Sequence, residues 1–297
     1  MAARTTPARL TRSLAVLFSL AVLFGSLVPA QAAVLDVDYV GRVQVSADPA
    51  LRSNAPDLYI PSGVLMTMDG QQLWARNADS RRAMASTTKI MTAVVALEKS
   101  DLNSIVTVDK LASAVGQSSM GLVTGERIPL GELLKGVLVQ SGNDAATLAA
   151  EYVGGSVDSF VAMMNAKAAQ LDLVNTHYVN PHGLDANGHY TSAADLTALA
   201  RYAMRDPVFR QIVGTYTVKV RSDRFTHVLT NHNSLLKSYP GTEGVKTGWT
   251  NNAGYCVVFA VKRGSIEFIG TVMGAANEVS RAKEATKLLD WTIVVVL

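Results

Sequence analysis

Cysteine is almost absent from this chain. Cys256 is the only cysteine among 297 residues, so no disulfide can form within the chain and the fold must depend on packing. Cys256 lies in the apolar run GYCVVFAV, which indicates a buried thiol rather than a nucleophile. A disulfide-stapled scaffold is excluded, and a cysteine-based active site is disfavoured.

Patterns that bind metal ions are also missing. The chain has five histidines, and His177, His182 and His189 fall in one loop-like stretch, but their spacing matches no zinc site. No H-E-x-x-H sequence occurs. We interpret these histidines as polar loop residues and expect neither a metal ion nor a cofactor.

One long apolar run is present, and it lies at the N-terminus. Arg4, Arg9 and Arg12 precede SLAVLFSLAVLFGSLV, and the small-residue sequence AQA follows at 30–32. The run is short for a membrane span, which needs about 20 apolar residues. We therefore predict a cleaved signal peptide at 1–32. Because no cysteine follows it, a lipid anchor is disfavoured, and we expect a protein exported to the periplasm or the cell exterior.

An excess of one charge is missing once this leader is removed. Three of the 27 basic residues belong to it, and the remaining 24 equal the 24 acidic residues. A globally basic surface is not supported, so we expect no nucleic-acid partner.

The rest of the chain predicts an α+β fold. Residues 33–61 form a lead-in with little pattern, and 62–79 predict a hairpin that turns at Asp69-Gly70. Residues 86–214 show mainly helical periodicity, strand patterns return after 214, and a last helix is expected at 279–291. Strands at both ends predict one sheet that joins the two ends, with a helical subdomain inserted between them. The tail TIVVVL is either a packed edge strand or a frayed end.

Three short motifs can carry chemistry. Ser86 and Lys89 form S-x-x-K at the start of a helical pattern, although a helix-capping serine with a solvated lysine would look the same. Ser141 and Asn143 lie in QSGNDAA between two helical patterns, where they could merely cap the second helix. The third motif, Lys246-Thr247-Gly248 in GVKTGWT, precedes the final strands, and Val245 excludes a phosphate-binding loop.

A lysine can activate a serine only when it is uncharged. No histidine is placed by the sequence to act as the base for Ser86. Burial and a second cation both lower a lysine pKa, and Lys246 could supply that cation. We therefore predict that Lys89 is the base for Ser86.

The three motifs in this order resemble those of penicillin-binding proteins and class A β-lactamases. With NPHGLD, HYTSAADL and AGYC, they make residues from about 62 to 291 similar to the low-molecular-mass penicillin-binding proteins, the S11-type serine D-alanyl-D-alanine carboxypeptidases. The resemblance implies a β-lactamase/transpeptidase-like fold: an antiparallel sheet of N- and C-terminal strands, flanking helices, and a peptidase domain over 62–297.

The resemblance also implies the roles of the motif residues. Ser86 would attack the peptide carbonyl to form an acyl-enzyme, and Ser141 with Lys246 would deliver a proton to the departing amine. Asn143 would orient the substrate. The remaining implied substrate contacts are a carboxylate bound by Lys246 and Thr247, a close approach of substrate at Gly248, and an oxyanion between the backbone N–H groups of Ser86 and Trp249.

The implied activity is removal of D-alanine from peptidoglycan stem peptides, with β-lactams as inhibitors. Residues 171–191 contain no glutamate that could speed acyl-enzyme hydrolysis, so a penicillin target is favoured over a β-lactamase. Cleavage of peptidoglycan cross-links as a D,D-endopeptidase and non-catalytic wall or penicillin binding stay open as alternatives. After Gly248 there is room only for the last strands and helix, so we expect no C-terminal β domain and favour a soluble extracytoplasmic protein over a membrane-attached one.

Overall fold

The structure is a computed structural model that describes residues 1–2 and 55–295. Apart from its first two residues, the predicted signal peptide at 1–32 lies outside the described residues, as does most of the lead-in at 33–61. The structural statements below concern residues 55–295.

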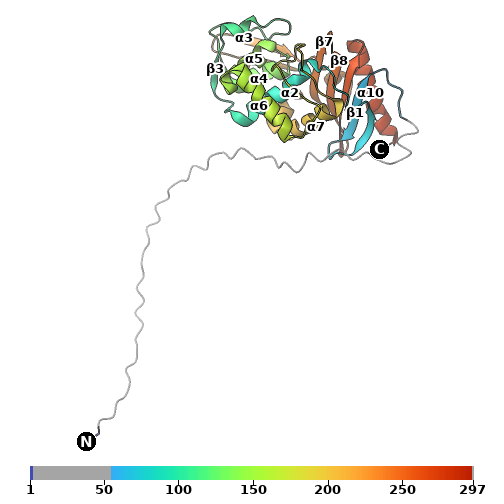
Figure 1. Cartoon of the computed structure of the whole chain (residues 1–297), viewed down its shortest axis with the longest axis horizontal. Helices are drawn as coiled ribbons and strands as arrows, with labels where there is room; N and C mark the ends of the chain where they lie inside the picture. The colour runs from blue at the N-terminus through green and yellow to red at the C-terminus, as the bar shows by residue number, and fades with distance from the viewer. Residues whose placement is uncertain (3–54, 296–297) are drawn as a thin grey trace. The chain divides into compact units, whose positions relative to one another are not determined.

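A five-stranded antiparallel sheet joins the two ends of the described chain (Figure 1). Its strand order is β2-β1-β9-β8-β7, so the N-terminal hairpin pairs with the last strand. The strands are β1 (Ser62–Thr67), β2 (Gln72–Arg76), β7 (Thr242–Thr250), β8 (Gly254–Arg263) and β9 (Ile266–Ala275). The predicted α+β fold, with a sheet built from N- and C-terminal segments, is confirmed.

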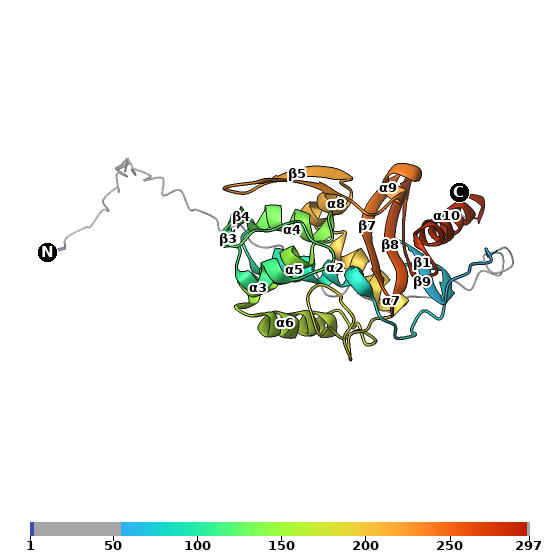
Figure 2. The same ribbon diagram turned by 90° about the horizontal axis from the view of Figure 1, so that it is seen from above.

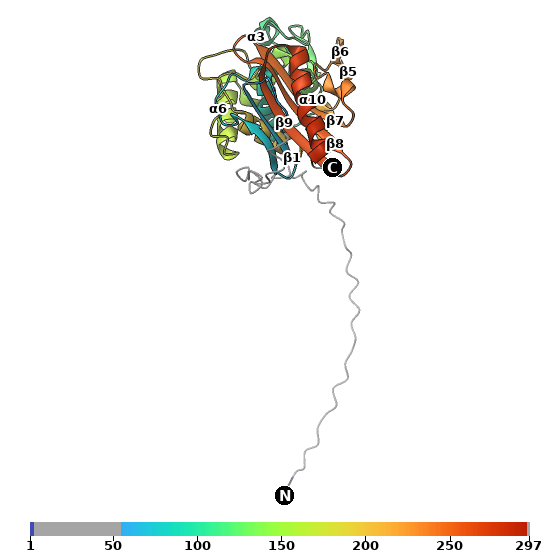
Figure 3. The ribbon, with the colours of Figure 1, turned by 90° about the vertical axis from the view of Figure 1, so that its right-hand side faces the viewer.

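The sheet is covered on both faces, which explains its nearly continuous apolar strands. Helix α10 (Glu278–Val295) packs on one face, and α7 (Ala193–Ala203) packs on the other (Figure 2). Figure 3 shows α10 lying across β8 and β9. Its buried Leu288 and Leu289 join Phe259 and Phe268 of the sheet in one apolar cluster. The tail through Val295 is helical, so neither an edge strand nor a frayed end describes it.

A helical region lies beside the sheet, as predicted for 86–214. It contains η2 (Ala85–Thr88), α2 (Lys89–Lys99), α3 (Lys110–Ala114), α4 (Leu130–Leu138), α5 (Asn143–Gly154), α6 (Val157–Gln170), α7 and α8 (Pro207–Val213). Several helices begin where a side chain caps the first turn: Asp109, Ser156, Ser192 and Asp206 accept bonds from backbone N–H groups. Two three-residue strands, β3 (Ile105–Thr107) and β4 (Arg127–Pro129), also lie here and are too short to have been predicted.

Two predicted strands stay apart from the main sheet. Strands β5 (Thr217–Arg221) and β6 (Thr226–Thr230) pair only with each other, and a short helix α9 (Leu235–Ser238) leads from them to β7. The Lys246-Thr247-Gly248 motif lies inside β7 rather than before the final strands. This placement sets the motif on the edge strand that faces the helical region (Figure 2).

Candidate active site

Ser86 lies in the tight turn η2, directly before helix α2. Neither η2 nor α2 has a side-chain cap bond, so the alternative in which Ser86 caps a helix is wrong. The preceding Ala85 has a φ of 49°, in the left-handed region that an alanine rarely adopts. This backbone conformation places Ser86 at the wall of a cavity instead of continuing the helix.

Two glycines let other segments approach the Ser86 turn closely. A Cβ atom at Gly248 would lie 2.8 Å from the Ser86 backbone nitrogen, and one at Gly183 would lie 1.9 Å from the Ala85 carbonyl oxygen. Gly183 also has a φ of +95°, which favours glycine. Strand β7, at Gly248, and the loop that contains Gly183 therefore hold the Ser86 turn between them. At Gly248, the segment that comes close to β7 is the Ser86 backbone of the protein itself.

Lys89 is completely buried beneath Ser86. Its Nζ atom lies 3.0 Å from Ser86 Oγ, 2.7 Å from Asn143 Oδ1 and 2.7 Å from the His182 carbonyl oxygen. The alternative of a solvated lysine at this position is wrong. Burial and the charge of Lys246 hold the Lys89 pKa well below its ordinary value, with Asp144 acting in the opposite direction.

Lys246 is the second buried amine of the site. It is 2% exposed, and its Nζ atom donates a hydrogen bond to the Thr247 carbonyl oxygen at 3.0 Å. Burial, and to a smaller extent the charge of Arg281, lower the pKa of Lys246 to about 7. The charge of Lys246 in turn lowers the pKa of Lys89, so the sheet side of the site acts electrostatically on the helical side.

The second motif meets the first at the end of α4 and the start of α5. Ser141 has a φ of 62° and lines the cavity, and Asn143 is the first residue of α5. The Asn143 amide is engaged on both sides, because its Oδ1 accepts from Lys89 and its Nδ2 donates to the Gly116 carbonyl oxygen at 3.0 Å. Asn143 thus orients Lys89 in the folded protein.

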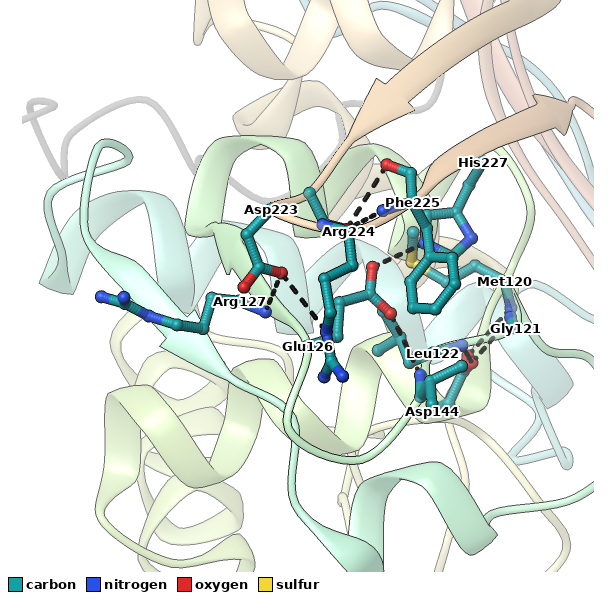
Figure 4. Close-up of polar contacts among 12 residues, drawn as sticks. Met120, Gly121, Leu122, Glu126, Arg127, Asp144, Asp223, Arg224, Phe225 and His227 are labelled. Atoms are coloured by element: carbon teal, nitrogen blue, oxygen red, sulfur yellow. Dashed lines mark hydrogen bonds and ion pairs between the residues drawn. The ribbon is translucent and has the colours of Figure 1, made fainter.

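Gln117 and Ser118 of the loop at 116–126 line the cavity, and two buried carboxylates hold this loop in place (Figure 4). Asp144 accepts hydrogen bonds from three successive backbone N–H groups, those of Met120, Gly121 and Leu122, at 3.0–3.1 Å. Glu126 accepts from the Val123 N–H at 3.1 Å and lies 2.7 Å from His227 Nε2 of β6. The loop is therefore tied to α5 on one side and to the β5–β6 hairpin on the other.

A cavity of about 720 Å³ brings the three motifs together. Six of its lining residues were predicted from the sequence: Ser86, Ser141, Asn143, Thr247, Gly248 and Trp249. The two remaining predicted residues, Lys89 and Lys246, are buried just beneath its surface. All eight predicted site residues thus gather at one place.

Arg281 is a site residue that the sequence analysis missed. It belongs to α10, is 5% exposed, lines the cavity and lowers the pKa of Lys246. Its guanidinium donates to Glu278 Oε1 at 2.9 Å and to the His232 carbonyl oxygen at 3.3 Å. Arg281 lies about one turn into the last helix and belongs to no motif, so the sequence does not mark it. The fold brings it to the same end of the cavity as Lys246, which we call the cationic end.

Two histidines near the site, His182 and His189, are uncharged residues of the loop at 171–191. His189 contacts Thr88 Oγ1 through Nε2 at 2.8 Å and accepts from the Val179 N–H through Nδ1 at 3.0 Å. Burial lowers the pKa of His189 to about 4 and that of His182 to about 3, so both rings are neutral. Within residues 55–295, no group of three or more His, Cys, Asp or Glu side chains is placed to hold a metal ion.

Comparison with known proteins identifies the family. Residues 45–277 match the family model of the S11 peptidases, described as D-alanyl-D-alanine carboxypeptidase. The chain belongs to the D-alanyl-D-alanine carboxypeptidase family. The predicted resemblance is confirmed by this match, which covers most of the chain.

Two curated members of this family illustrate the likeness. The chain is 39% identical over 237 residues to D-alanyl-D-alanine carboxypeptidase DacF of Bacillus subtilis, which covers 77% of this chain and 61% of DacF. It is 38% identical over 266 residues to the D-alanyl-D-alanine carboxypeptidase of Streptomyces sp. strain K15, covering 83% of this chain and 91% of that enzyme. The chain thus spans less than two thirds of the Bacillus protein and most of the Streptomyces one.

Solved structures in the family share the fold. The crystal structure of the Streptomyces K15 DD-transpeptidase superposes with a TM-score of 0.79 at 34% identity, covering 82% of this chain and all of that one. The predicted β-lactamase/transpeptidase-like fold is confirmed by this similarity. In the described part of the chain, no helix of this family member is both long and apolar enough to cross a bilayer.

Proposed function

We propose that this protein is a serine D-alanyl-D-alanine carboxypeptidase that removes the terminal D-alanine of peptidoglycan stem peptides through an acyl-enzyme. One observation carries the proposal: the completely buried Lys89 amine lies 3.0 Å from Ser86 Oγ at the wall of an open cavity. The names of the similar curated proteins support the same activity.

Lys89 is arranged to act as the general base. A neutral amine has two N–H donors and one lone pair. The carbonyl oxygens of Asn143 and His182 can accept the two N–H groups, which leaves the lone pair for the Ser86 hydroxyl. Burial and Lys246 both lower the Lys89 pKa, which favours the neutral amine that can take the Ser86 proton.

The attacked carbonyl oxygen would become negative in the tetrahedral intermediate. We assign its stabilisation to the backbone N–H groups of Ser86 and Trp249, which belong to segments brought together at Gly248. When the intermediate collapses, the C–N bond breaks and the departing D-alanine amine needs a proton. Ser141 at the cavity wall and Lys246 beneath it are the groups proposed to deliver that proton.

The substrate's terminal carboxylate would bind at the cationic end of the cavity. Thr247 can donate its hydroxyl there, and Lys246 and Arg281 supply positive charge from β7 and α10. Arginine suits a carboxylate because it can donate two parallel N–H bonds. In the free protein this guanidinium is paired with Glu278, whose side chain is 62% exposed and can be displaced.

β-Lactams would acylate Ser86 and stay attached. Both acidic residues that line the cavity have partners in the free protein: Asp185 accepts from Thr250 Oγ1 at 2.7 Å, and Glu278 is paired with Arg281. No glutamate occurs in 171–191 to activate a water molecule against the acyl-enzyme. We therefore infer slow hydrolysis of the penicilloyl enzyme.

We further propose that the protein acts outside the cytoplasm on the cell wall. The support is the leader pattern at 1–32 and the peptidoglycan substrate that the activity implies. N-terminal sequencing of the secreted protein is expected to give a start near Ala33. A start at Met1 or Ala2 would contradict the proposed cleavage.

A single assay tests the activity. Purified protein is incubated with a stem pentapeptide and, separately, with a cross-linked peptide dimer, and released D-alanine and monomer are quantified. We expect D-alanine from the pentapeptide and a fluorescent penicillin adduct that is lost in Ser86→Ala. Release of monomer without D-alanine would indicate an endopeptidase, and absence of both a product and a Ser86-dependent adduct would indicate a binding protein.

A further inference from the structure

Trp249 is the exposed member of the protein's three tryptophans. Trp74 and Trp291 are 9% and 7% exposed, whereas 51% of Trp249 is open to solvent. Tryptophan is enriched where proteins meet ligands and partners, because its ring is apolar and its N–H can donate a hydrogen bond. Its backbone N–H has been assigned to the oxyanion, but the indole itself has no role in the chemistry described above.

The indole lies beside the cationic end of the cavity. In a strand, alternate residues share a face, so Trp249 and Thr247 project to the same side of β7, and both line the cavity. Trp249 pairs in register with Tyr255 of β8, and their ring centroids lie 5.7 Å apart. The Arg281 guanidinium lies 5.9 Å from the centre of the Tyr255 ring. The two rings therefore adjoin the groups proposed to bind the carboxylate.

The aromatic pair is held in place. Cross-strand pairing fixes the distance between the backbones of the two residues, and contact between their rings adds to this restraint. Tyr255 is half-buried, and its ring has both the Trp249 indole and the Arg281 guanidinium as neighbours. A ring supported in this way forms a wall, because it cannot move aside without losing these contacts.

We propose that Trp249 and Tyr255 form a wall that restricts the leaving-group subsite to a small terminal residue. The proposal rests on the carboxypeptidase function. The side chain of a C-terminal residue branches from the carbon next to the carboxylate, so a carboxylate at Thr247 and Arg281 directs that side chain toward the two rings. The methyl group of D-alanine fits beside them, whereas a large side chain or the branched amine of a peptide cross-link meets the indole.

The wall thereby favours carboxypeptidase over endopeptidase activity. A cross-link presents as leaving group the side-chain amine of a diamino acid that carries its own peptide. That group is much larger than D-alanine, but the bond broken is the same D-alanyl amide. Selection then depends on the space beyond the scissile bond, which is where the indole stands.

The test varies the leaving group and the indole together. Substrates are N-acyl-L-Lys-D-Ala-D-Xaa peptides with D-Ala, D-Leu or D-Phe as the last residue, and kcat/KM is measured from release of the free D-amino acid. We expect the native enzyme to prefer D-Ala over D-Leu and D-Phe at least 10-fold. Trp249→Ala is expected to reduce that preference at least 10-fold, and Trp249→Phe to retain most of it.

Trp249→Ala keeps the backbone N–H, so the oxyanion contact survives while the ring is removed. Circular dichroism and thermal unfolding confirm that the variant is folded. If Trp249→Ala lowers kcat/KM equally for all three peptides, the indole is a general binding surface and the proposed wall is refuted. An unchanged preference would refute it as well.

A binding measurement separates this inference from the proposed function. In Ser86→Ala, the affinities of the three peptides are measured by calorimetry with and without Trp249→Ala. Weaker binding of the D-Leu and D-Phe peptides that recovers without the indole supports the wall even if the native protein releases no D-amino acid. Equal affinities in both backgrounds, or no binding of any peptide, would overturn it.

Discussion

The two sides of the cavity hold basic side chains in different surroundings. On the helical side, Lys89 is completely buried and surrounded by carbonyl oxygens, and its charge is suppressed. On the sheet side, Lys246 has a pKa of about 7 and Arg281 stays a cation beside Glu278. In the proposed mechanism the helical side therefore supplies the base, and the sheet side supplies the charges that bind the substrate. Lysine would serve both roles because the surroundings of Lys89 and Lys246 differ.

Removing the base from the helical side is expected to have the largest effect. In Lys89→Ala the Ser86 hydroxyl loses its proton acceptor, and the rate of acylation by fluorescent penicillin should fall by about 10³-fold or more. Stopped-flow or gel-based labelling measures this rate. Lys99→Ala on the exposed end of the same helix is the matched control and should label at the native rate. Native-rate labelling of Lys89→Ala would show that another group is the base.

The loop wall on the helical side can be broken next. Asp144→Asn replaces a buried acceptor of three backbone N–H groups by an amide that cannot accept all of them. We expect the free energy of unfolding to fall by about 2–4 kcal/mol, measured by urea denaturation. The exposed Asp158→Asn in the first turn of α6 should change it by less than about 0.5 kcal/mol. Equal losses would contradict a special role of the buried carboxylate.

On the sheet side, Arg281→Gln sharpens the assignment of the carboxylate site. We expect kcat/KM for a peptide with a free terminal carboxylate to fall by about 10- to 100-fold, while the C-terminally amidated peptide is nearly unaffected. An equal loss for both peptides would show that Arg281 acts through the fold.

The same variant makes a pH prediction. Loss of protons from Lys246 should make kcat/KM fall as the pH rises above about 7. Because Arg281 lowers the pKa of Lys246, its removal should raise that pKa and move the falling limb to higher pH. A limb that stays in place or moves to lower pH would contradict this electrostatic coupling.

The smallest expected effect is that of His189 on the pH dependence of the free energy of unfolding. The pKa of His189 is about 4 in the folded protein and about 6.5 in the unfolded chain. Between these values the unfolded chain binds more protons, so the free energy of unfolding falls as the pH is lowered. We expect a loss of about 1–2 kcal/mol between pH 7 and pH 5 from this residue. His189→Gln should make the pH dependence shallower, and identical slopes would contradict the assignment.

The fold could be predicted to a large extent because its signals are local. The Asp69-Gly70 turn marked the first hairpin, and 3.6-residue periodicity marked the helices. The separate pairing of β5 with β6 was not predictable, because strand propensity does not state which strand is the partner. The short strands β3 and β4 depend on contacts between distant segments and carry little pattern of their own.

The site residues that belong to sequence motifs were predicted, and those that only the folded chain brings to the cavity were missed. The eight predicted residues gather at the cavity, but Arg281 reaches them from a helix that carries no motif. The acceptor from His182 is a backbone carbonyl, which any residue type could provide. Asp144 follows Asn143 directly, and a carboxylate at a helix start is read first as a cap rather than as the support of a distant loop.

The groups that cover Lys89 would also determine which atom becomes acylated in the proposed mechanism. An uncharged amine is a stronger nucleophile than an alcohol, and an amide formed there would be a dead end that water does not reverse on a useful timescale. Lys89 has no exposed surface, and carbonyl oxygens of Asn143 and His182 cover it on the sides away from Ser86. In the proposed mechanism the incoming peptide would therefore meet the Ser86 oxygen and not the amine, and the product would be a hydrolysable ester.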